Sequence, residues 1–433
     1  MTEKEAEEYI YSSYLRAAPF QDRNARDSEK RHPELSRPLL RELSAVPCTV
    51  VTGSKGKGSS ASMLASLLEA RMKTGLMTSP HLSDFRERFR VSGRMISPEQ
   101  FRQSATAVKP WFDAVEETLE RDVCISPMGI QAAAALTWFG EEGTQYNVFE
   151  CGKGAQYDDV AGIPHPYAMI GSIFAEHTRE LGSTAEEIAA DKAHVMDGAG
   201  AAFSARQTPR VMAVLRERAA REGCALYTDG EDFRPLNVRF TQGGMVFDAA
   251  VGERFFEQLR VPLLGEHQAH NAVLALANAL AVIPDLTDEE VRSRLAAVSW
   301  PARMEVLGRE PFVMLDACVN RVSAAEAVRV LDALGIGRAA VVIGIPDDKD
   351  YAGTAACMSV RADRLILTKT ANPHYAASPA QVEVLRQKGI TASWADHVPN
   401  ALKAAFGTGL PVVLLGTGAF AGEARDLIRE GII

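Results

Sequence analysis

The segment VTGSKGKGSS, residues 51–60, places glycines, lysines and serines in an order suited to binding phosphate. Gly53, Gly56 and Gly58 let backbone N–H groups approach an anion closely, because glycine has no side chain in the way. Lys57 can reach the outer phosphates of a nucleotide, and Ser59 is expected near a metal ion there. The residues expected to contact phosphate are Gly53, Ser54, Lys55, Gly56, Lys57, Gly58 and Ser59.

The spacing of this loop differs from the common GxxxxGK[ST] loop, since two residues separate Gly53 from Gly56 and a glycine follows Lys57. A glycine-rich turn without a ligand is the alternative interpretation. The apolar run CTVVTG before the loop and the helical pattern after it favour phosphate binding. A helix N-terminus at the end of a strand adds positive potential at that point.

Two oxygen-bearing side chains end other short apolar runs, Ser79 in TGLMTS and Glu150 in YNVFECG. Ligands of open α/β sheets gather at the C-terminal ends of the strands. Mg²⁺ prefers oxygen ligands and keeps several waters, so one or two such groups with phosphate oxygens can hold it. The sequence therefore predicts a magnesium site at Ser79 and Glu150, although a strand-end glutamate taken alone is more often solvated surface.

The elements that must position these groups alternate from Cys48 onward, with short apolar runs between amphipathic helical stretches. This alternation predicts an α/β fold with a largely parallel sheet covered by helices. Residues 232–261 alternate with period two around a turn at Gln242–Gly244, so we expect a small antiparallel hairpin there. Four apolar runs after Trp300 predict a second, smaller Rossmann-like α/β domain.

We place the first domain at residues 1–297 and the second at residues 298–433. Residues 1–46 are expected to be helical and polar. Within them, residues 21–38 are expected to cross the surface between two helices and to carry no chemistry.

Composition and charge narrow the class of protein. Apolar residues make up 46% and charged residues 24%, an ordinary globular balance. The net charge of -9 opposes nucleic-acid binding, and no stretch approaches the roughly 20 apolar residues that span a bilayer. The six scattered cysteines fit neither a zinc site nor a disulfide framework. We expect a cytoplasmic monomer or small homo-oligomer acting on small molecules, without membrane or nucleic-acid partners.

Several motifs occur in an order that resembles one family. GSKGKGSS resembles the ATP loop of the Mur ligase superfamily, in the variant typical of folylpolyglutamate and dihydrofolate synthases. The later segments that resemble the family are TSPHLSDFRERFRVSGRMIS, FECG, EHTRELGSTAEEIAADKA, LGEHQAHNAVLALANAL, WPARMEVL and the DK of IPDDKD. The resemblance extends over residues 48–433 and implies a Mur ligase-type ATP-binding domain followed by a Rossmann-like ligase domain.

The resemblance also implies roles for residues outside the loop. His177 matches a histidine that holds a second magnesium, and Lys192 matches a lysine that the family carboxylates to a carbamate. Taken alone, they would be a structural histidine and a solvated lysine. Arg303 and Asp316 match residues at the ATP phosphates and near the nucleotide, and Asn271 is expected near adenine or ribose. The expected catalytic residues are Lys57, His177 and Lys192, and the expected metal ligands are Ser79, Glu150 and His177.

Three segments depart from the family pattern. DACVNR, residues 316–321, has Val319 where the family uses a histidine for the incoming glutamate. In FECGKGAQYDDV, residues 149–160, Ala155 and Gln156 replace a glycine and an arginine, and CISPMGIQAAAAL lacks a phenylalanine–glutamate pair and a threonine. These changes predict a remodelled substrate wall, with His81, Gln156 and Arg321 as candidate contacts.

We therefore expect an ATP- and Mg²⁺-dependent ligase that activates a carboxylate as an acyl phosphate and joins it to an amine, expected to be that of an amino acid. The three departures predict a non-standard substrate pair. Two alternatives stay open: a genuine folylpolyglutamate or dihydrofolate synthase that tolerates the changes, and a nucleotide-binding accessory protein that has lost ligation.

Overall fold

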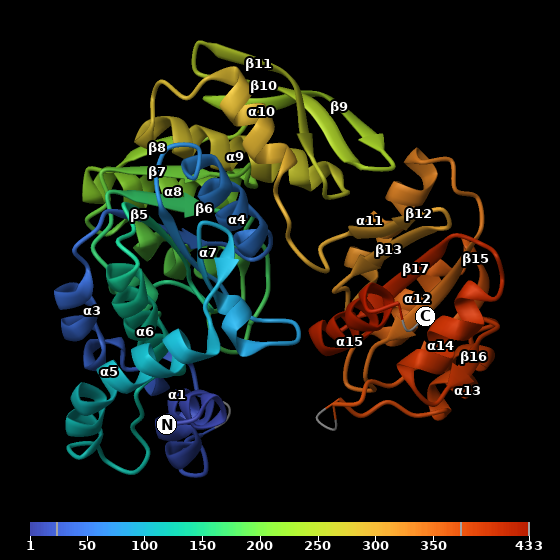
Figure 1. Ribbon diagram of the computed structural model, residues 1–433, viewed down its shortest axis with the longest axis horizontal. Coiled ribbons are helices and arrows are strands. Elements are labelled where there is room, and N and C mark those ends of the chain that lie inside the picture. Colours follow the sequence, from blue (N-terminus) through green and yellow to red (C-terminus); the bar gives the residue numbers. More distant parts are fainter. Residues whose placement is uncertain (23–24, 373–374, 432–433) are drawn as a thin grey trace.

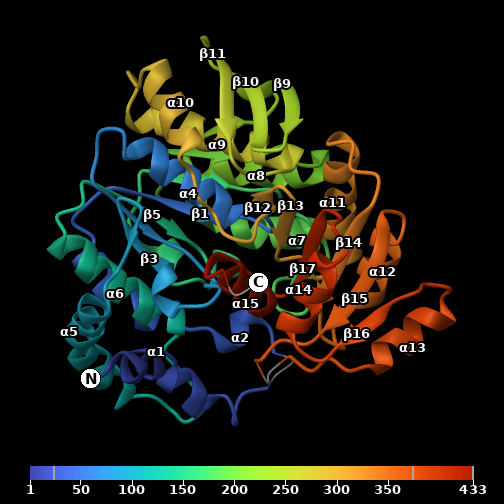
Figure 2. The ribbon, with the colours of Figure 1, turned by 45° about the vertical axis from the view of Figure 1, so that its right-hand side comes forward.

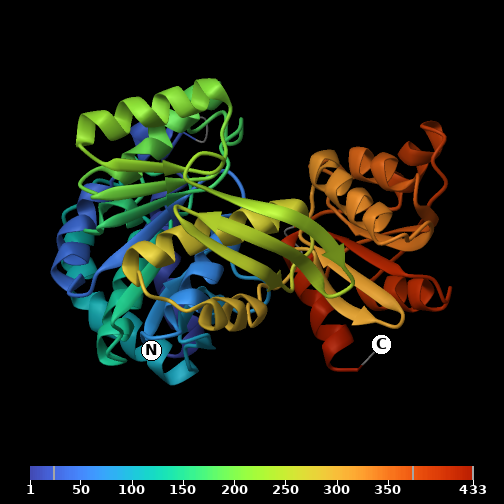
Figure 3. The same ribbon diagram turned by 90° about the horizontal axis from the view of Figure 1, so that it is seen from above.

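The computed structural model describes residues 1–22, 25–372 and 375–431. Two α/β domains lie side by side, and a small three-stranded sheet extends from the first toward the second (Figures 1 and 3). The predicted fold class, two α/β domains of which the second is smaller, is confirmed.

The first domain is built on an eight-stranded sheet with the order β4-β3-β2-β5-β1-β6-β7-β8. Its parallel strands are β1 (Cys48–Thr52), β2 (Thr74–Met77), β5 (Tyr146–Glu150), β6 (Tyr167–Ile170), β7 (Ala201–Ser204) and β8 (Ala225–Thr228). Two short antiparallel strands, β3 (Phe89–Val91) and β4 (Arg94–Met95), close one edge. The largely parallel sheet predicted from the alternating pattern is therefore present.

Helices cover both faces of this sheet, so its central strands are buried on both sides. Val50 and Phe149 face one apolar cluster, whereas their neighbours Val51 and Val148 face the other. The helices of the first cluster are α1 (Glu3–Ala17), α3 (Arg37–Leu43), α5 (Pro98–Glu116), α6 (Pro127–Glu141), α7 (Ala185–Lys192) and α8 (Pro209–Glu222). Those of the second are α4 (Lys57–Leu68), α9 (Glu266–Val282) and α10 (Asp288–Ala296).

The N-terminal segment differs from its prediction as a polar surface crossing. Helix α2 (Asp27–Lys30) lies between α1 and α3, and Asp27 and Ser36 are buried. The Ser36 hydroxyl donates to the Asp159 carboxylate at 2.5 Å, and the Lys153 ammonium lies 3.1 Å from Asp27. Polar residues are buried here because they bond to one another across two segments distant in the chain.

The region predicted as a hairpin is a three-stranded antiparallel sheet. Strands β9 (Phe233–Thr241), β10 (Gly244–Val251) and β11 (Arg254–Val261) follow one another, with the predicted turn between the first two. A second tight turn at Gly252, with φ of 54°, adds the third strand. This sheet packs on α9, and Phe240 also contacts the apolar core of the second domain.

The second domain has a six-stranded sheet with the order β12-β13-β17-β14-β15-β16. Its strands are β12 (Glu305–Arg309), β13 (Phe312–Asp316), β14 (Ala339–Gly344), β15 (Ala362–Thr368), β16 (Ser393–Ala395) and β17 (Val412–Gly416). All neighbours are parallel except β12 and β13. The helices are α11 (Arg321–Ala333), α12 (Tyr351–Met358), α13 (Ala380–Gln387), α14 (Val398–Phe406) and α15 (Gly418–Arg429). Figure 2 shows this domain beside the first.

The sequence predicted no membrane-spanning segment, and neither a zinc site nor disulfides among the cysteines. In the described ranges, no helix combines the length and the apolar character needed to cross a bilayer. All six cysteines are free, and five of them are buried. The thiols therefore pack as small apolar groups.

Candidate active site

The glycine loop joins the end of β1 to the start of α4, the arrangement predicted for a phosphate site. Gly53 and Gly56 have φ of 142° and 81°, which side chains rarely adopt. A Cβ on Gly53 would lie 2.9 Å from the Cα of Gly171, so the loop packs directly on the segment that follows β6. Ser54 anchors it there by donating its N–H to the Ser172 carbonyl at 2.8 Å.

A cavity of about 440 Å³ opens beside this loop, between the two domains. It is bounded by the loop, the ends of β2 and β5, helix α9 and the start of the second sheet. The predicted site residues that line it are Ser54, Lys55, Gly56, Lys57, Gly58, Ser59, Ser79, Glu150, Asn271, Arg303 and Asp316. Except for Gly53, which does not line the cavity, the nucleotide residues predicted from four separate segments thus share one cleft.

Glu150 and Ser79, the predicted metal ligands, are neighbours at the sheet edge. The Ser79 N–H donates to a Glu150 carboxylate oxygen at 3.0 Å. Burial raises the pKa of Glu150, and the nearby Lys57 ammonium opposes that rise. A magnesium ion fits this donor set only with phosphate oxygens and waters, because within the described residues no cluster of three or more His, Cys, Asp or Glu could hold a metal.

Lys192 is buried, so it is not the solvated lysine that the sequence alone would suggest. Its ammonium lies 3.0 Å from the Gly53 carbonyl oxygen and 3.3 Å from the Glu176 carboxylate. Burial, together with the charge of Lys57, lowers the pKa of Lys192. An amine with a lowered pKa is more often uncharged, the form that can react with carbon dioxide.

His177 follows Glu176 but does not line the nucleotide cavity. Its φ of 47° is unusual for a residue other than glycine, and its carbonyl accepts N–H groups of Glu180 and Leu181 at 2.9 Å. Burial lowers the pKa of His177, which favours the neutral imidazole that binds metals. The role of His177 as a ligand of a second metal ion therefore stays a prediction.

Arg303 lies in the linker between the two domains and its side chain lines the cleft. The residues on either side of it adopt the left-handed backbone conformation. Ala302 and Met304 have φ of 52° and 48°. Each N–H is held by a carboxylate at 2.9 Å, that of Ala302 by Glu305 and that of Met304 by Asp316. Left-handed residues other than glycine cost about 1–3 kcal/mol each, so these two bonds stabilise the backbone that presents Arg303.

Glu305 is itself fixed by the last helix of the chain. Arg425 and Arg429 of α15 both donate to its carboxylate at 3.0 Å. Only 8% of Glu305 is exposed, and Arg425 is also largely buried, so this pair is shielded from water, whereas the Arg429 side chain is 53% exposed. Helix α15 thereby supports the linker that carries Arg303.

The three candidate substrate residues lie outside the nucleotide cleft. His81 accepts a hydrogen bond from Arg88 at 3.0 Å, and Arg321 starts α11 with its N–H bonded to Asp350 at 3.0 Å. Gln156 lines a different cavity of the first domain. The structure does not bring these three residues together around one ligand.

Some residues of the cleft were not predicted. The Lys55 ammonium contacts the Ser323 hydroxyl at 2.5 Å, which joins the loop to the second domain. The other lining residues absent from the prediction are Pro80, Ser172, Phe174, His267, Gln268, Met304, Ala317, Val322, Ser323 and Glu326. The His-Gln pair stands in the motif LGEHQAHN, whereas Phe174 and Val322 give no chemical signal in the sequence.

Fold and cleft together define a two-domain protein in which a glycine-rich loop of the phosphate-binding type lines a cleft between the two domains. Residues 51–279 match the Mur ligase middle domain, and residues 302–418 match the Mur ligase glutamate ligase domain. The chain belongs to the Mur ligase family. The predicted class, the ATP-dependent carbon–nitrogen ligases, is confirmed at the level of this family.

Similar proteins come from the folate branch of the family. A probable bifunctional folylpolyglutamate synthase/dihydropteroate synthase of Haloferax volcanii is 35% identical over 70% of this chain and 36% of its own length. The dihydrofolate synthase/folylpolyglutamate synthase of Mycobacterium tuberculosis is 30% identical over 76% of this chain and 71% of its own. The chain thus spans about a third of the first relative and most of the second.

Solved structures show the same architecture. Mycobacterium tuberculosis folylpolyglutamate synthase, complexed with ADP and AMPPCP, superposes with a TM-score of 0.84 at 27% identity. The superposition covers 92% of this chain and 96% of that protein. The likeness therefore includes both domains.

Proposed function

We propose that the protein is an ATP-dependent folylpolyglutamate or dihydrofolate synthase, which joins glutamate to a folate-type carboxylate and releases ADP and phosphate. The observation that carries the proposal is the cleft in which Lys57 and Glu150 of the first domain face Arg303 and Asp316 of the second. The names of the relatives support the substrate class. This choice adopts the alternative left open by the sequence instead of the non-standard substrate pair.

The first step forms an acyl phosphate. An oxygen of the substrate carboxylate bonds to the γ-phosphorus of ATP, the bond from that phosphorus to the bridging oxygen breaks, and ADP leaves. Lys57 and Arg303 flank the cleft from opposite domains, so they neutralise charge on the transferring group. Magnesium, when held by Glu150, Ser79 and phosphate oxygens, would supply further neutralisation.

The second step forms the amide. The glutamate nitrogen attacks the acyl carbon, the bond from that carbon to the phosphate oxygen breaks, and phosphate leaves while the nitrogen loses a proton. Water would hydrolyse the acyl phosphate, so the cleft must close before it forms. The Lys55–Ser323 contact, which already joins the two domains, is consistent with such closure.

A ligase for another substrate pair is the second candidate. The observation behind it is the altered family motif at Ala155 and Gln156, in a segment that the N-terminal segment holds. Arg37 donates to the Gln156 carbonyl at 3.1 Å, and Arg31 donates to the Lys153 carbonyl at 3.0 Å. Both bonds reach backbone carbonyls, so the N-terminal segment fixes the path of the chain on which the altered residues stand.

The test is ADP release by the purified chain with ATP and magnesium, with each acceptor supplied with and without glutamate. Dihydropteroate and tetrahydrofolate are the two acceptors, and mass spectrometry identifies the glutamylated product. We expect ADP release that requires both partners, with turnover on the order of 1 per second. Failure with both acceptors, but turnover with another carboxylate and amine, would establish the second candidate.

A further inference from the structure

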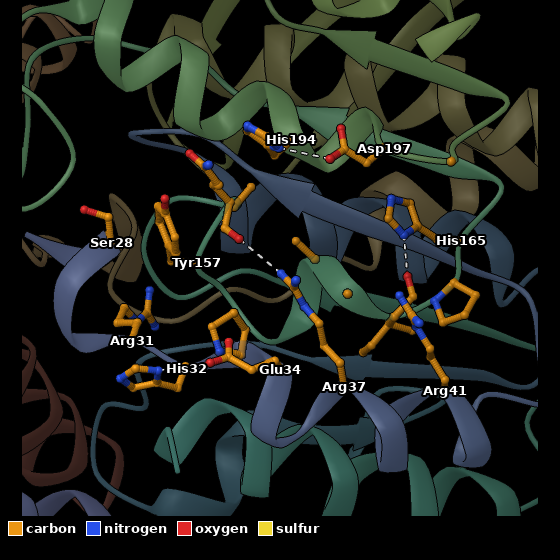
Figure 4. Close-up of a pocket in the computed structure, with 18 residues that line it drawn as sticks. Ser28, Arg31, His32, Glu34, Arg37, Arg41, Tyr157, His165, His194 and Asp197 are labelled. Atoms are coloured by element: carbon orange, nitrogen blue, oxygen red, sulfur yellow. Dashed lines mark hydrogen bonds and ion pairs between the residues drawn. The ribbon is translucent and has the colours of Figure 1, made fainter. Parts of the chain in front are cut away.

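A second cavity, of about 850 Å³, lies in the first domain and shares no lining residue with the nucleotide cleft. One wall is the N-terminal segment from Ser28 to Arg41, and the other is formed by residues 155–165 and 194–198. Figure 4 shows Arg37 and Arg41 extending from α3 toward the second wall. The volume is within the range of small-molecule sites, so we call this space the N-terminal cavity.

The acidic side chains of the N-terminal cavity already have cationic or imidazole partners. Glu34 lies 3.0 Å from the His32 ring, and Asp197 lies 2.9 Å from the His194 ring. Asp197 is also paired with Arg218 from outside the cavity. Asp197 on the second wall is therefore already neutralised by Arg218, whereas Glu34, on the same wall as Arg37 and Arg41, bonds to His32 and, in the part of the chain that the structure describes, forms no ion pair with either arginine.

Of the three arginines in the N-terminal cavity, only Arg31 is neutralised. Its guanidinium lies 3.5 Å from Asp27 and 3.6 Å from Asp158, both buried. Within the described ranges of the chain, neither Arg37 nor Arg41 forms an ion pair. Two arginines without an ion-pair partner among the described residues thus face one concave space in a protein of net charge -9.

Arg37 is held in position by the opposite wall. A Cβ on Gly162 would lie 2.5–2.7 Å from the Nε, Cγ and Cδ atoms of Arg37, so this side chain lies directly on the glycine backbone. One terminal nitrogen donates to the Gln156 carbonyl at 3.1 Å. An arginine fixed in this way loses little conformational freedom when it binds a ligand.

We propose that the N-terminal cavity binds a small oligoanion, a molecule with two or more carboxylate or phosphate groups, through Arg37 and Arg41. The planar guanidinium donates paired hydrogen bonds to either kind of group. Neither arginine lines the nucleotide cleft, so the proposal does not depend on the ligation reaction.

The test is calorimetric titration of the full chain with citrate and with tripolyphosphate, a tricarboxylate and a phosphate chain. Tripolyphosphate can also occupy the phosphate loop, so the titrations use the Lys57→Ala background. We expect one binding event, weakened about tenfold or more by Arg41→Gln and further by Arg37→Gln. Tighter binding of citrate assigns the site to carboxylates, and tighter binding of tripolyphosphate assigns it to phosphates.

Two further variants separate the site from general charge effects. Gly162→Ala keeps every charge but displaces Arg37, so it should weaken binding as Arg37→Gln does. Arg221→Gln removes an exposed arginine paired with Glu217 elsewhere, and it should leave binding unchanged. Arg41 is exposed, so Arg41→Gln should fold normally. The proposal is overturned if neither anion binds, or if Arg221→Gln weakens binding as much as Arg41→Gln.

Discussion

Lys57 and Lys192 donate to the same oxygen, the carbonyl of Gly53, each at 3.0 Å. The first lysine begins α4 and the second ends α7, so two distant segments place two ammonium groups next to one another. Burial lowers the pKa of Lys192, and the like charge of Lys57 lowers it further. The two lysines are therefore not equivalent, and different tests apply to them.

Lys57→Ala should keep the fold and lower turnover by about a hundredfold or more, because a positive charge beside the transferring phosphate is lost. ADP release under saturating substrates measures the effect, and thermal unfolding checks the fold. Lys73→Ala is the matched control, since Lys73 pairs with Glu142 away from the cleft. Equal activity of the two variants would remove Lys57 from the mechanism.

Lys192→Ala should be almost inactive, and formate or acetate should restore part of its activity by supplying a short carboxylate. The reason is the predicted carbamate, which turns a cation into an oxygen ligand. Carbon-13 NMR with labelled bicarbonate should show a carbamate signal in the native protein that is absent from Lys192→Met. If the native protein shows no carbamate signal, and neither formate nor acetate restores activity to Lys192→Ala, then Lys192 acts as a structural cation.

Glu305→Ala should raise the KM for ATP and lower kcat roughly tenfold, because the linker no longer holds Arg303 in the cleft. Adding Ala302→Gly should recover part of the loss, since glycine adopts the positive φ of 52° without strain. Glu305→Gln keeps an acceptor oxygen, so its kcat and its KM for ATP should lie between those of the native protein and those of Glu305→Ala.

The control for these variants is Glu383→Ala, an exposed acid of the same domain paired with Arg386. It should leave KM and kcat unchanged. If glycine at position 302 gives no recovery, Glu305 stabilises the second domain without positioning Arg303.

Asp159 should make stability depend on pH. Burial raises the pKa of Asp159 from its ordinary 3.8 to about 6, so the folded state holds this proton more tightly than the unfolded state. The contribution of Asp159 to the free energy of unfolding is fully present below pH 3.8, where the carboxyl is protonated in both states. It is lost as the pH rises to about 6. Asp159→Asn should therefore gain up to about 3 kcal/mol over the native protein between low and neutral pH.

Urea unfolding of both proteins at several pH values across this range measures the difference. Asp158→Asn serves as a comparison, because Asp158 accepts N–H groups of Gly152, Lys153 and Val160 and should lose stability on substitution. Parallel stability curves for the native protein and Asp159→Asn would show that Asp159 does not titrate in this range.

The sequence predicted the phosphate loop and the strands because these signals are local. Glycines at 53, 56 and 58 stand between an apolar run and a helical pattern, and that order can be recognised without any distant contact. The third strand of the small sheet was missed, because its turn at Gly252 carries a weaker signal than the Gln-Gly-Gly turn before it. The burial of Asp27 and Ser36 was missed for another reason, since Lys153 and Asp159, with which they pair, lie more than a hundred positions away.

The sequence by itself determined the fold class, the phosphate loop and the acidic and hydroxyl groups at the strand ends, since each follows from neighbouring residues. Only the tertiary structure decided that Lys192 shares a carbonyl with Lys57, that Glu305 supports the linker of Arg303, and that Arg37 and Arg41 face a cavity without carboxylate partners. These relations depend on which segments pack together. Packing is set by the whole apolar core, so no single stretch of sequence contains the information.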